Sequence, residues 1–252
     1  MSTFILVHGS WHAAWCWYKV VPRLEHAGHR AIAIDLPGHG RDHRPFGQVT
    51  MQDCVEAIGV AIEQADEPPI LVAHSRGGLP VTQAAEAFSG RIRLLIYLAA
   101  FLVPDGETVV PLAISDKTSL ILPNLDIDRE GGFDMLRQSA FREALYADCS
   151  EEDVALATML LDHEPSGPTN TAISTTADRY ETVPRAYIEL TEDRAVTHAL
   201  QKRMQERVPC RESVAIATSH SAYFSRPDEL TSALIGLAER HALPITSVRS
   251  RG

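Results

Sequence analysis

A serine that could act as a nucleophile lies at a turn in the first third of the chain. Ser75 follows a short apolar run at 70–73, within the sequence Ala73-His74-Ser75-Arg76-Gly77. This pattern matches the Gly-x-Ser-x-Gly turn between a strand and a helix, with Ala73 replacing the first glycine. Small residues are needed because the strained turn brings the two backbones close together. The motif predicts Ser75 as the attacking group; the alternative is a helix N-cap serine followed by closely packed glycines.

A histidine and an aspartate could activate this serine. A serine hydroxyl is a weak nucleophile until an imidazole accepts its proton, and a buried carboxylate must hold that imidazole in one tautomer. Where such a serine turn occurs, the chain order is serine, then acid, then histidine. His220 follows an apolar run at 214–217 and Asp193 follows one at 186–190, so we predict them as base and acid. The alternatives for the acid are Glu192 and Asp105.

The loop after the first apolar run could stabilise negative charge on oxygen. This run ends in His8-Gly9-Ser10-Trp11-His12. A turn there can place a backbone N–H beside the nucleophile, and two such groups are needed to bind a developing oxyanion. We assign them to the backbones of Ser10 and Arg76. His8 is expected to be structural, whereas Gly9 and His12 are candidates for the substrate pocket, and His74 is expected to pack beside the serine.

Short apolar runs alternate with longer helical patterns along most of the chain. Strands covered on both faces are continuously apolar, so this alternation predicts a parallel sheet wrapped by helices. Together with the serine turn it predicts an α/β-hydrolase fold with a mostly parallel sheet of about six strands. The predicted strands are 4–7, 31–35, 70–73, 94–99, 186–190 and 214–217, and the predicted helices lie near 15–27, 51–65, 79–88, 196–207 and 229–241.

Residues 104–183 interrupt this alternation. They contain several prolines, the pair Gly131-Gly132 and helical patterns near 133–145 and 151–161, but no clear strand. We predict a helical cap here, inserted into a core formed by residues 1–103 and 184–252. The polar end at 247–252 is expected to be frayed. Five apolar residues of the cap could line the pocket, although packing is the favoured interpretation for any one of them: Leu120, Leu122, Phe133, Leu160 and Leu161.

The composition excludes several classes of protein. The chain has 252 residues, 45% hydrophobic and 22% charged, which suits one soluble domain. A net charge of −10 argues against nucleic acid or an anionic membrane as the partner. The four cysteines are scattered, which predicts neither a disulfide framework nor a zinc site. With an N-terminal apolar run too short for a signal or a membrane span, we expect a cytoplasmic protein.

With these residues in view, almost the whole chain resembles the plant methylesterase and hydroxynitrile lyase branch of the α/β-hydrolases. The resemblance supports Asp193 over Glu192 as the acid. It implies an enzyme without metal or cofactor, with an apolar pocket beneath a helical cap, and often a homodimer. The stretches that carry it are His8-Gly9, Ala14-Trp15-Cys16-Trp17-Tyr18-Lys19, 28–36, the Ser75 turn, 148–157, 179–185 and 191–193.

Departures from the family pattern favour ester hydrolysis over lyase activity. The resembling lyases have a threonine after the first histidine and a lysine after the catalytic histidine, where this chain has Gly9 and Ser221. Without that lysine there is no obvious cation to hold a departing cyanide. We therefore predict a serine esterase that hydrolyses small carboxylic esters with apolar groups through an acyl-enzyme. The alternatives are a carbon–carbon lyase and a non-catalytic ligand-binding protein. Arg76 also departs from the pattern. Its side chain is expected to reach outward to a surface carboxylate, and the alternative is a contact with the substrate.

Overall fold

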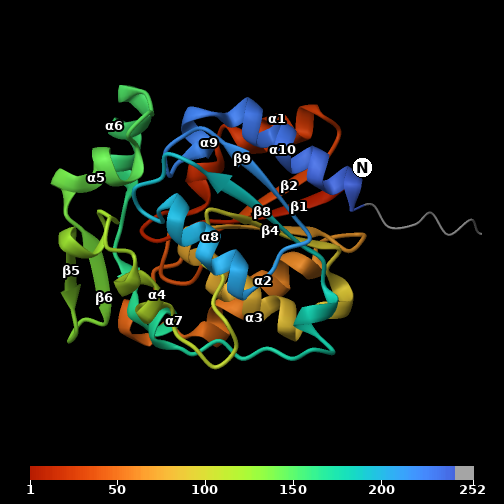
Figure 1. Cartoon of the computed structure of the whole chain (residues 1–252), viewed down its shortest axis with the longest axis horizontal. Helices are drawn as coiled ribbons and strands as arrows, with labels where there is room; N and C mark the ends of the chain where they lie inside the picture. The colour runs from red at the N-terminus through yellow and green to blue at the C-terminus, as the bar shows by residue number, and fades with distance from the viewer. Residues whose placement is uncertain (242–252) are drawn as a thin grey trace, which may run out of the picture.

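A six-stranded parallel sheet forms the centre of the computed structural model, which describes residues 1–241 (Figure 1). The strand order is β2-β1-β3-β4-β8-β9, and every neighbouring pair is parallel. The predicted sheet is therefore confirmed, while the end predicted to fray at 247–252 lies outside the described residues. The strands are β1 (Thr3–Val7), β2 (Arg30–Ile34), β3 (Ile70–His74), β4 (Leu94–Leu98), β8 (Arg185–Leu190) and β9 (Glu212–Ile216).

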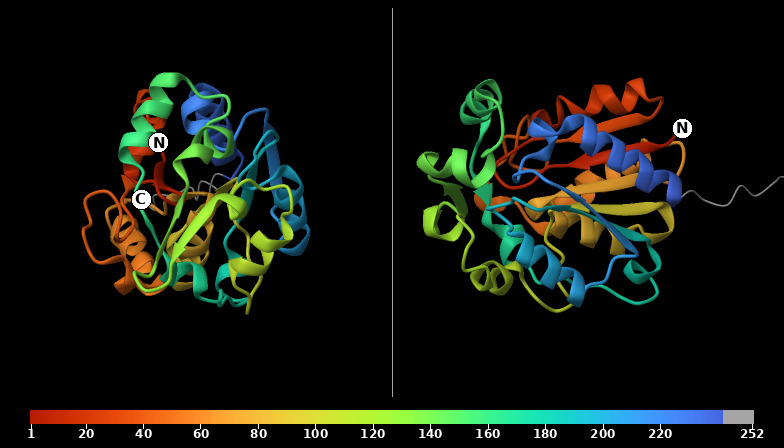
Figure 2. Two further views of the ribbon diagram at one scale, coloured as in Figure 1. Left: turned by 90° about the vertical axis from the view of Figure 1, so that its left-hand side faces the viewer. Right: turned by 45° about the horizontal axis from the view of Figure 1, so that its top comes forward.

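The two faces of the sheet are covered by separate apolar layers. In β1, Phe4 and Leu6 join one buried cluster, whereas Ile5 and Val7 join the other. Successive side chains of a strand point to opposite faces, so a continuous apolar run fills both layers. The first layer contains α1 (Val20–His26), α9 (Ala222–Ser225) and α10 (Pro227–Arg240), and the second contains α2 (Met51–Glu63), α3 (Gly78–Ala87) and α8 (His198–Arg207), as Figures 1 and 2 show.

Most predicted helices agree with the structure, but the one predicted at 15–27 is divided. A short 3₁₀ helix, η1 (Ala14–Trp17), is followed by α1. No helix among the described residues is long and apolar enough to cross a membrane.

The segment between β4 and β8 departs from the prediction. It contains a three-stranded sheet of β5 (Leu125–Asp128), β6 (Phe133–Leu136) and β7 (Glu164–Pro165), so the expectation of no clear strand was wrong. The helix predicted from 133 begins only at Gln138, because Gly131-Gly132 closes a hairpin between β5 and β6, with Gly132 at φ +71°. That residues 104–183 form a separate cap stays a prediction. The helices of this segment are α4 (Val109–Ser115), α5 (Gln138–Leu145), α6 (Glu151–Leu160) and α7 (Ser166–Asn170).

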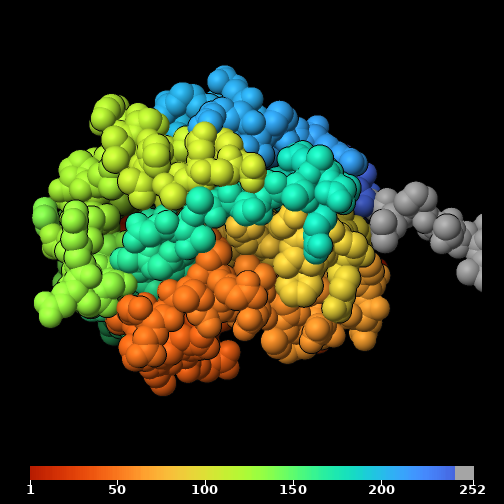
Figure 3. Space-filling view, turned by 90° about the horizontal axis from the view of Figure 1, so that it is seen from below, coloured from red at the N-terminus to blue at the C-terminus, as the bar shows by residue number. Residues whose placement is uncertain are grey.

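The return from this segment to β8 lies along the outside of α3. Ser174 N–H donates to Gln83 Oε1 and Thr176 N–H donates to Glu86 Oε2, both at 2.9 Å. In Figure 3 this stretch, coloured teal, crosses the lower face between the orange residues near 40–60 and the yellow-green residues near 105–120. These contacts fasten the C-terminal end of the segment to α3.

Candidate active site

The nucleophile turn has the strained geometry that the motif predicts. β3 ends at His74, and Ser75 has φ +53°, a region that residues other than glycine rarely adopt. The two following glycines are sterically required, because a Cβ on Gly77 would lie 2.4 Å from the His8 carbonyl oxygen and one on Gly78 2.2 Å from that of Phe101. The strain is thus held by backbone packing on both sides of the serine.

His220 and Asp193 meet at the carboxyl edge of the sheet, where parallel strands end together. His220 Nδ1 lies 2.7 Å from Asp193 Oδ2, and the two side chains are 3% and 0% exposed. The other carboxylate oxygen accepts hydrogen bonds from the Ala195 and Val196 backbone N–H groups. Because a carboxylate faces Nδ1, this nitrogen carries the proton, which leaves Nε2 with its lone pair. The rival acids Glu192 and Asp105 are exposed.

Ser75 and His220 face the same cavity. Within the described residues no direct hydrogen bond joins the Ser75 hydroxyl to His220 Nε2. Such contacts are often long in the free enzyme and shorten when substrate binds. The structure therefore brings together the acid and the base, and places the serine on the cavity that the base also lines.

The two backbone amides assigned to the oxyanion also border this cavity. Ser10 lies in the loop after β1, and Arg76 follows the nucleophile. Neither N–H donates a hydrogen bond within residues 1–241. Two free donors beside a nucleophilic serine are what a tetrahedral oxyanion requires.

His12 does not line the cavity, contrary to the prediction. Its Nδ1 faces the Ser10 carbonyl oxygen at 2.7 Å and must donate, so Nε2 accepts from the hydroxyls of Tyr146 and Tyr223 at 2.7 and 3.0 Å. Burial lowers the pKa of His12 to about 3. This neutral ring donates to the Ser10 carbonyl and so holds the loop after β1.

His8 and His74 also pack around the site as neutral rings. His8 Nδ1–H donates to the Gly9 carbonyl and Nε2 accepts from Leu36 N–H, and burial together with the charge of His39 lowers the pKa of His8 to about 4. His74 Nε2–H donates to the His220 carbonyl at 3.0 Å, and burial holds the pKa of His74 well below its usual value. Both rings therefore support loops of the site without charge.

Gly9 has a steric role instead of the predicted place in the pocket. A Cβ on Gly9 would lie 2.7 Å from Ser75 Cβ and 2.9 Å from His74 Nδ1. Gly9 does not border the main cavity. The glycine allows the loop after β1 to approach the nucleophile turn.

The Arg76 side chain points inward, which corrects the expectation of a surface contact. Its Nη1 and Nη2 donate to the two carboxylate oxygens of Asp134 at 3.1 and 3.2 Å, and Nη1 also donates to Thr169 Oγ1 at 2.6 Å. The guanidinium is only 12% exposed. Sequence patterns missed Asp134 and Thr169 because both lie in the 104–183 segment, where no motif indicated a site.

The cavity has a volume of about 610 Å³ and lies between the core and the 104–183 segment. Leu122 lines it, as predicted for the pocket, whereas Leu160 is 43% exposed and does not. Leu120 and Leu161 pack against the core cluster instead. The apolar wall is formed mainly by Phe101, Val109, Ala113, Leu125, Leu145, Val196 and Leu200.

Among residues 1–241, no group of three or more His, Cys, Asp or Glu side chains is arranged to hold a metal ion. The four cysteines are all free thiols.

Comparison with known proteins agrees with this geometry. Residues 4–233 match the family model described as the alpha/beta hydrolase family. Methylesterase 9 from Arabidopsis thaliana is 32% identical, with 96% of this chain and 100% of that protein covered, so the predicted resemblance to plant methylesterases is confirmed.

Two solved structures extend the comparison. A pyrethroid hydrolase from Sphingobium faniae JZ-2 superposes with a TM-score of 0.83 at 27% identity, covering 94% of this chain and 97% of that one. Methylketone synthase I from tomato superposes with a TM-score of 0.85 at 25% identity, covering 96% and 99%. From its sequence match, its sheet and its serine turn, the chain belongs to the α/β hydrolase family.

Proposed function

We propose that this protein is a serine esterase that hydrolyses small carboxylic esters with an apolar group. The observation that carries the proposal is the position of Ser75 and His220 on one apolar cavity, with His220 held at 2.7 Å by the buried Asp193. Relatives named methylesterases support ester hydrolysis as the reaction and make methyl esters the first substrates to test.

The first half of the reaction forms an acyl-enzyme. Ser75 Oγ attacks the ester carbonyl carbon while His220 Nε2 accepts the hydroxyl proton. The imidazolium that forms is stabilised by Asp193. The carbonyl oxygen becomes negative, and the N–H groups of Ser10 and Arg76 stabilise it, each donor contributing about 3 kcal/mol in a dry site. His220 then donates its proton to the leaving alcohol as the carbon–oxygen bond breaks.

The second half releases the acid. Water enters in place of the alcohol, and His220 removes a proton from it as it attacks the acyl carbon. The same two amides stabilise the second oxyanion. The intermediate collapses to the free carboxylic acid, and Ser75 regains its proton from His220.

The cavity selects the substrate class. Its wall beyond the nucleophile is formed by Phe101, Leu145, Val196 and Leu200, which exclude water and favour an apolar acyl or alcohol group. A volume of about 610 Å³ suits a small organic ester and not a polymer.

The test is turnover of a panel of esters by the purified protein. The panel contains p-nitrophenyl acetate, butyrate, octanoate and dodecanoate together with methyl esters of aromatic acids. We expect hydrolysis that rises with the apolar area of the substrate and falls by about 10⁴-fold or more in Ser75→Ala, which should fold normally. Turnover retained in Ser75→Ala would exclude Ser75 as the nucleophile.

A carbon–carbon lyase and a non-catalytic binding protein are the alternatives. The position after His220 is the buried Ser221, whose hydroxyl donates to Tyr223, and the Arg76 guanidinium at the cavity is engaged by Asp134. Neither arrangement favours binding of a departing cyanide. Release of cyanide or aldehyde from a cyanohydrin would support the lyase, and binding of esters without turnover would support the binding protein.

A homodimer and a cytoplasmic location belong to the same proposal. The dimer is inferred from the family resemblance, and the location from the scattered cysteines. Light scattering on the purified protein tests the first, and fractionation of the source cells tests the second.

A further inference from the structure

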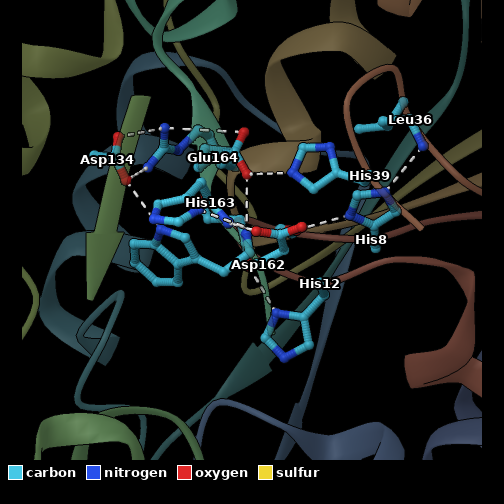
Figure 4. Close-up of polar contacts among 12 residues, drawn as sticks. His8, His12, Leu36, His39, Asp134, Asp162, His163 and Glu164 are labelled. Carbon is cyan, nitrogen blue, oxygen red and sulfur yellow. Dashed lines mark hydrogen bonds and ion pairs between the residues drawn. The ribbon is translucent and has the colours of Figure 1, made fainter. Parts of the chain in front are cut away.

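Two buried carboxylates of the 104–183 segment reach across to the core beside the nucleophile. Asp134 on β6 and Glu164 on β7 are direct partners in the antiparallel register. Their residues are only 5% and 6% exposed. Figure 4 shows Asp134 and Glu164 on one side of the cluster, with His39 beyond Glu164.

These carboxylates hold Trp11, which follows the proposed donor Ser10, and the side chain of Arg76, whose backbone N–H is the other proposed donor. Glu164 Oε2 accepts from the Trp11 backbone N–H at 2.9 Å, and Asp134 Oδ1 accepts from the Trp11 indole Nε1–H at 2.9 Å. Asp134 also accepts both hydrogen bonds from the Arg76 guanidinium, which lies 5.8 Å from the centre of the Trp11 ring. Trp11 follows Ser10 in the chain, and Arg76 follows Ser75.

The loop that carries Ser10 needs this support. Trp11 has φ +63°, a strained conformation for a residue with a Cβ. Two hydrogen bonds from one strand pair fix both its backbone and its ring. The peptide unit between Ser10 and Trp11 contains the Ser10 carbonyl and the Trp11 N–H. Holding the Trp11 N–H therefore fixes the Ser10 carbonyl and, through it, the loop that carries the Ser10 N–H.

The charges of Asp134, Glu164, His39 and Arg76, which together form one buried cluster, balance. His39 Nδ1 faces the Pro37 carbonyl at 3.2 Å and Nε2 faces Glu164 at 3.0 Å, so both ring nitrogens point at acceptors and both must carry protons. The imidazolium of His39 and the guanidinium of Arg76 then oppose the carboxylates of Glu164 and Asp134. A cluster that is neutral as a whole can stay charged in the interior and keep a fixed geometry.

We propose that Asp134 and Glu164 are positioning residues for the oxyanion hole, which they align by holding Trp11 and Arg76. This inference rests on the proposed esterase function. Neither carboxylate takes part in the bond-making steps, although Asp134 borders the cavity and Glu164 does not. They stabilise mainly the transition state, in which the Ser10 and Arg76 amides bind a negative oxygen. They contribute little to binding of the uncharged ester.

The experiment compares Asp134→Asn and Glu164→Gln with Asp153→Asn. Asp153 is a suitable control because it is a buried carboxylate of the same segment that also bridges to the core, through Lys19 and Tyr18, but touches neither Trp11 nor Arg76. For each folded variant we measure kcat and KM on one ester, inhibition by a trifluoromethyl ketone that forms a tetrahedral adduct with serine, and the thermal midpoint.

Positioning predicts a specific pattern. In Asp134→Asn or Glu164→Gln, kcat falls about tenfold or more, KM changes less than about threefold, and the trifluoromethyl ketone binds more weakly in proportion to kcat/KM. Asp153→Asn lowers the thermal midpoint without these changes. Each of the two test variants removes one of the two carboxylates, so a single variant that folds is sufficient to test the inference.

Two results would overturn the inference. One is kcat and inhibitor affinity within twofold of wild type in a folded Glu164→Gln or Asp134→Asn protein. The other is an equal loss in Asp153→Asn, which would indicate a general effect of destabilisation. If the wild-type protein itself hydrolyses no ester and does not bind the ketone, the proposed function has failed and not the positioning role.

Discussion

Two buried carboxylate–histidine pairs in the described part of the chain have opposite roles. In Asp193–His220 the carboxylate holds Nδ1–H and the second ring nitrogen opens on the cavity, so the ring can accept a proton. In Glu164–His39 the second nitrogen faces the Pro37 carbonyl, and the ring stays protonated. The group that faces the second ring nitrogen therefore decides whether such a pair is a base or a structural cation.

The largest expected effect is a loss of kcat when the Asp193–His220 pair is altered. Asp193→Asn removes the charge that fixes the tautomer of His220 and should lower kcat by about 10³–10⁴-fold with the fold retained. The measurement is steady-state hydrolysis of the best ester in the panel.

Glu192→Gln is the matched control, because Glu192 is the exposed neighbour of Asp193. It should leave kcat within about twofold of wild type. If Glu192→Gln were the more damaging change, the acid would have been assigned to the wrong carboxylate.

The Glu164–His39 pair should affect the pH dependence of the free energy of unfolding. Burial alone would raise the pKa of Glu164, but the charges of His39 and Arg76 with the hydrogen bonds of the cluster lower it to about 2 from 4.5. Because the folded-state pKa is depressed, the stabilisation is present above pH 4.5 and is lost as pH falls toward 2. Between pH 5.5 and 3.5, wild type should lose about 1 kcal/mol of free energy of unfolding through this group.

Urea unfolding of wild type and of the His39→Gln/Glu164→Gln double variant measures this loss. The double variant is needed because His39 would otherwise titrate once its partner is removed. Below pH 5.5 the His39 of wild type is charged in both states, since burial lowers its pKa but Glu164 raises it more. Parallel curves for the two proteins would show that Glu164 titrates normally.

The smallest effect concerns the ring behind the Ser10 loop. Tyr146→Phe removes one of two hydroxyls that donate to His12 Nε2 and should lower stability by about 1 kcal/mol and kcat a few-fold. Tyr97→Phe, a buried tyrosine that bonds Thr82 instead, should cost similar stability without changing kcat. Equal kcat in both variants would contradict a role for His12 in holding Ser10.

The catalytic residues could be predicted from the sequence, whereas the buried carboxylates of the 104–183 segment could not. Asp193 and Ser75 were identified because strand ends in a parallel sheet meet at one edge, so order along the chain determines proximity. Asp134 and Glu164 lie in short strands of the 104–183 segment, and their hydrogen-bond partners are between 58 and 153 residues away in the chain. The hairpin itself had a signal, the Gly131-Gly132 pair between alternating residues, but its partners depend on how the segment folds back onto the core.

The most direct test of the account is detection of an acyl group on Ser75. Enzyme mixed with a p-nitrophenyl ester and quenched in acid within milliseconds is digested and analysed by mass spectrometry. The account predicts that the mass of the acyl group is added to the peptide that carries residue 75 in wild type and is absent in Ser75→Ala. Rapid ester hydrolysis with no acylated residue 75, or with the acyl group on another side chain, would contradict it.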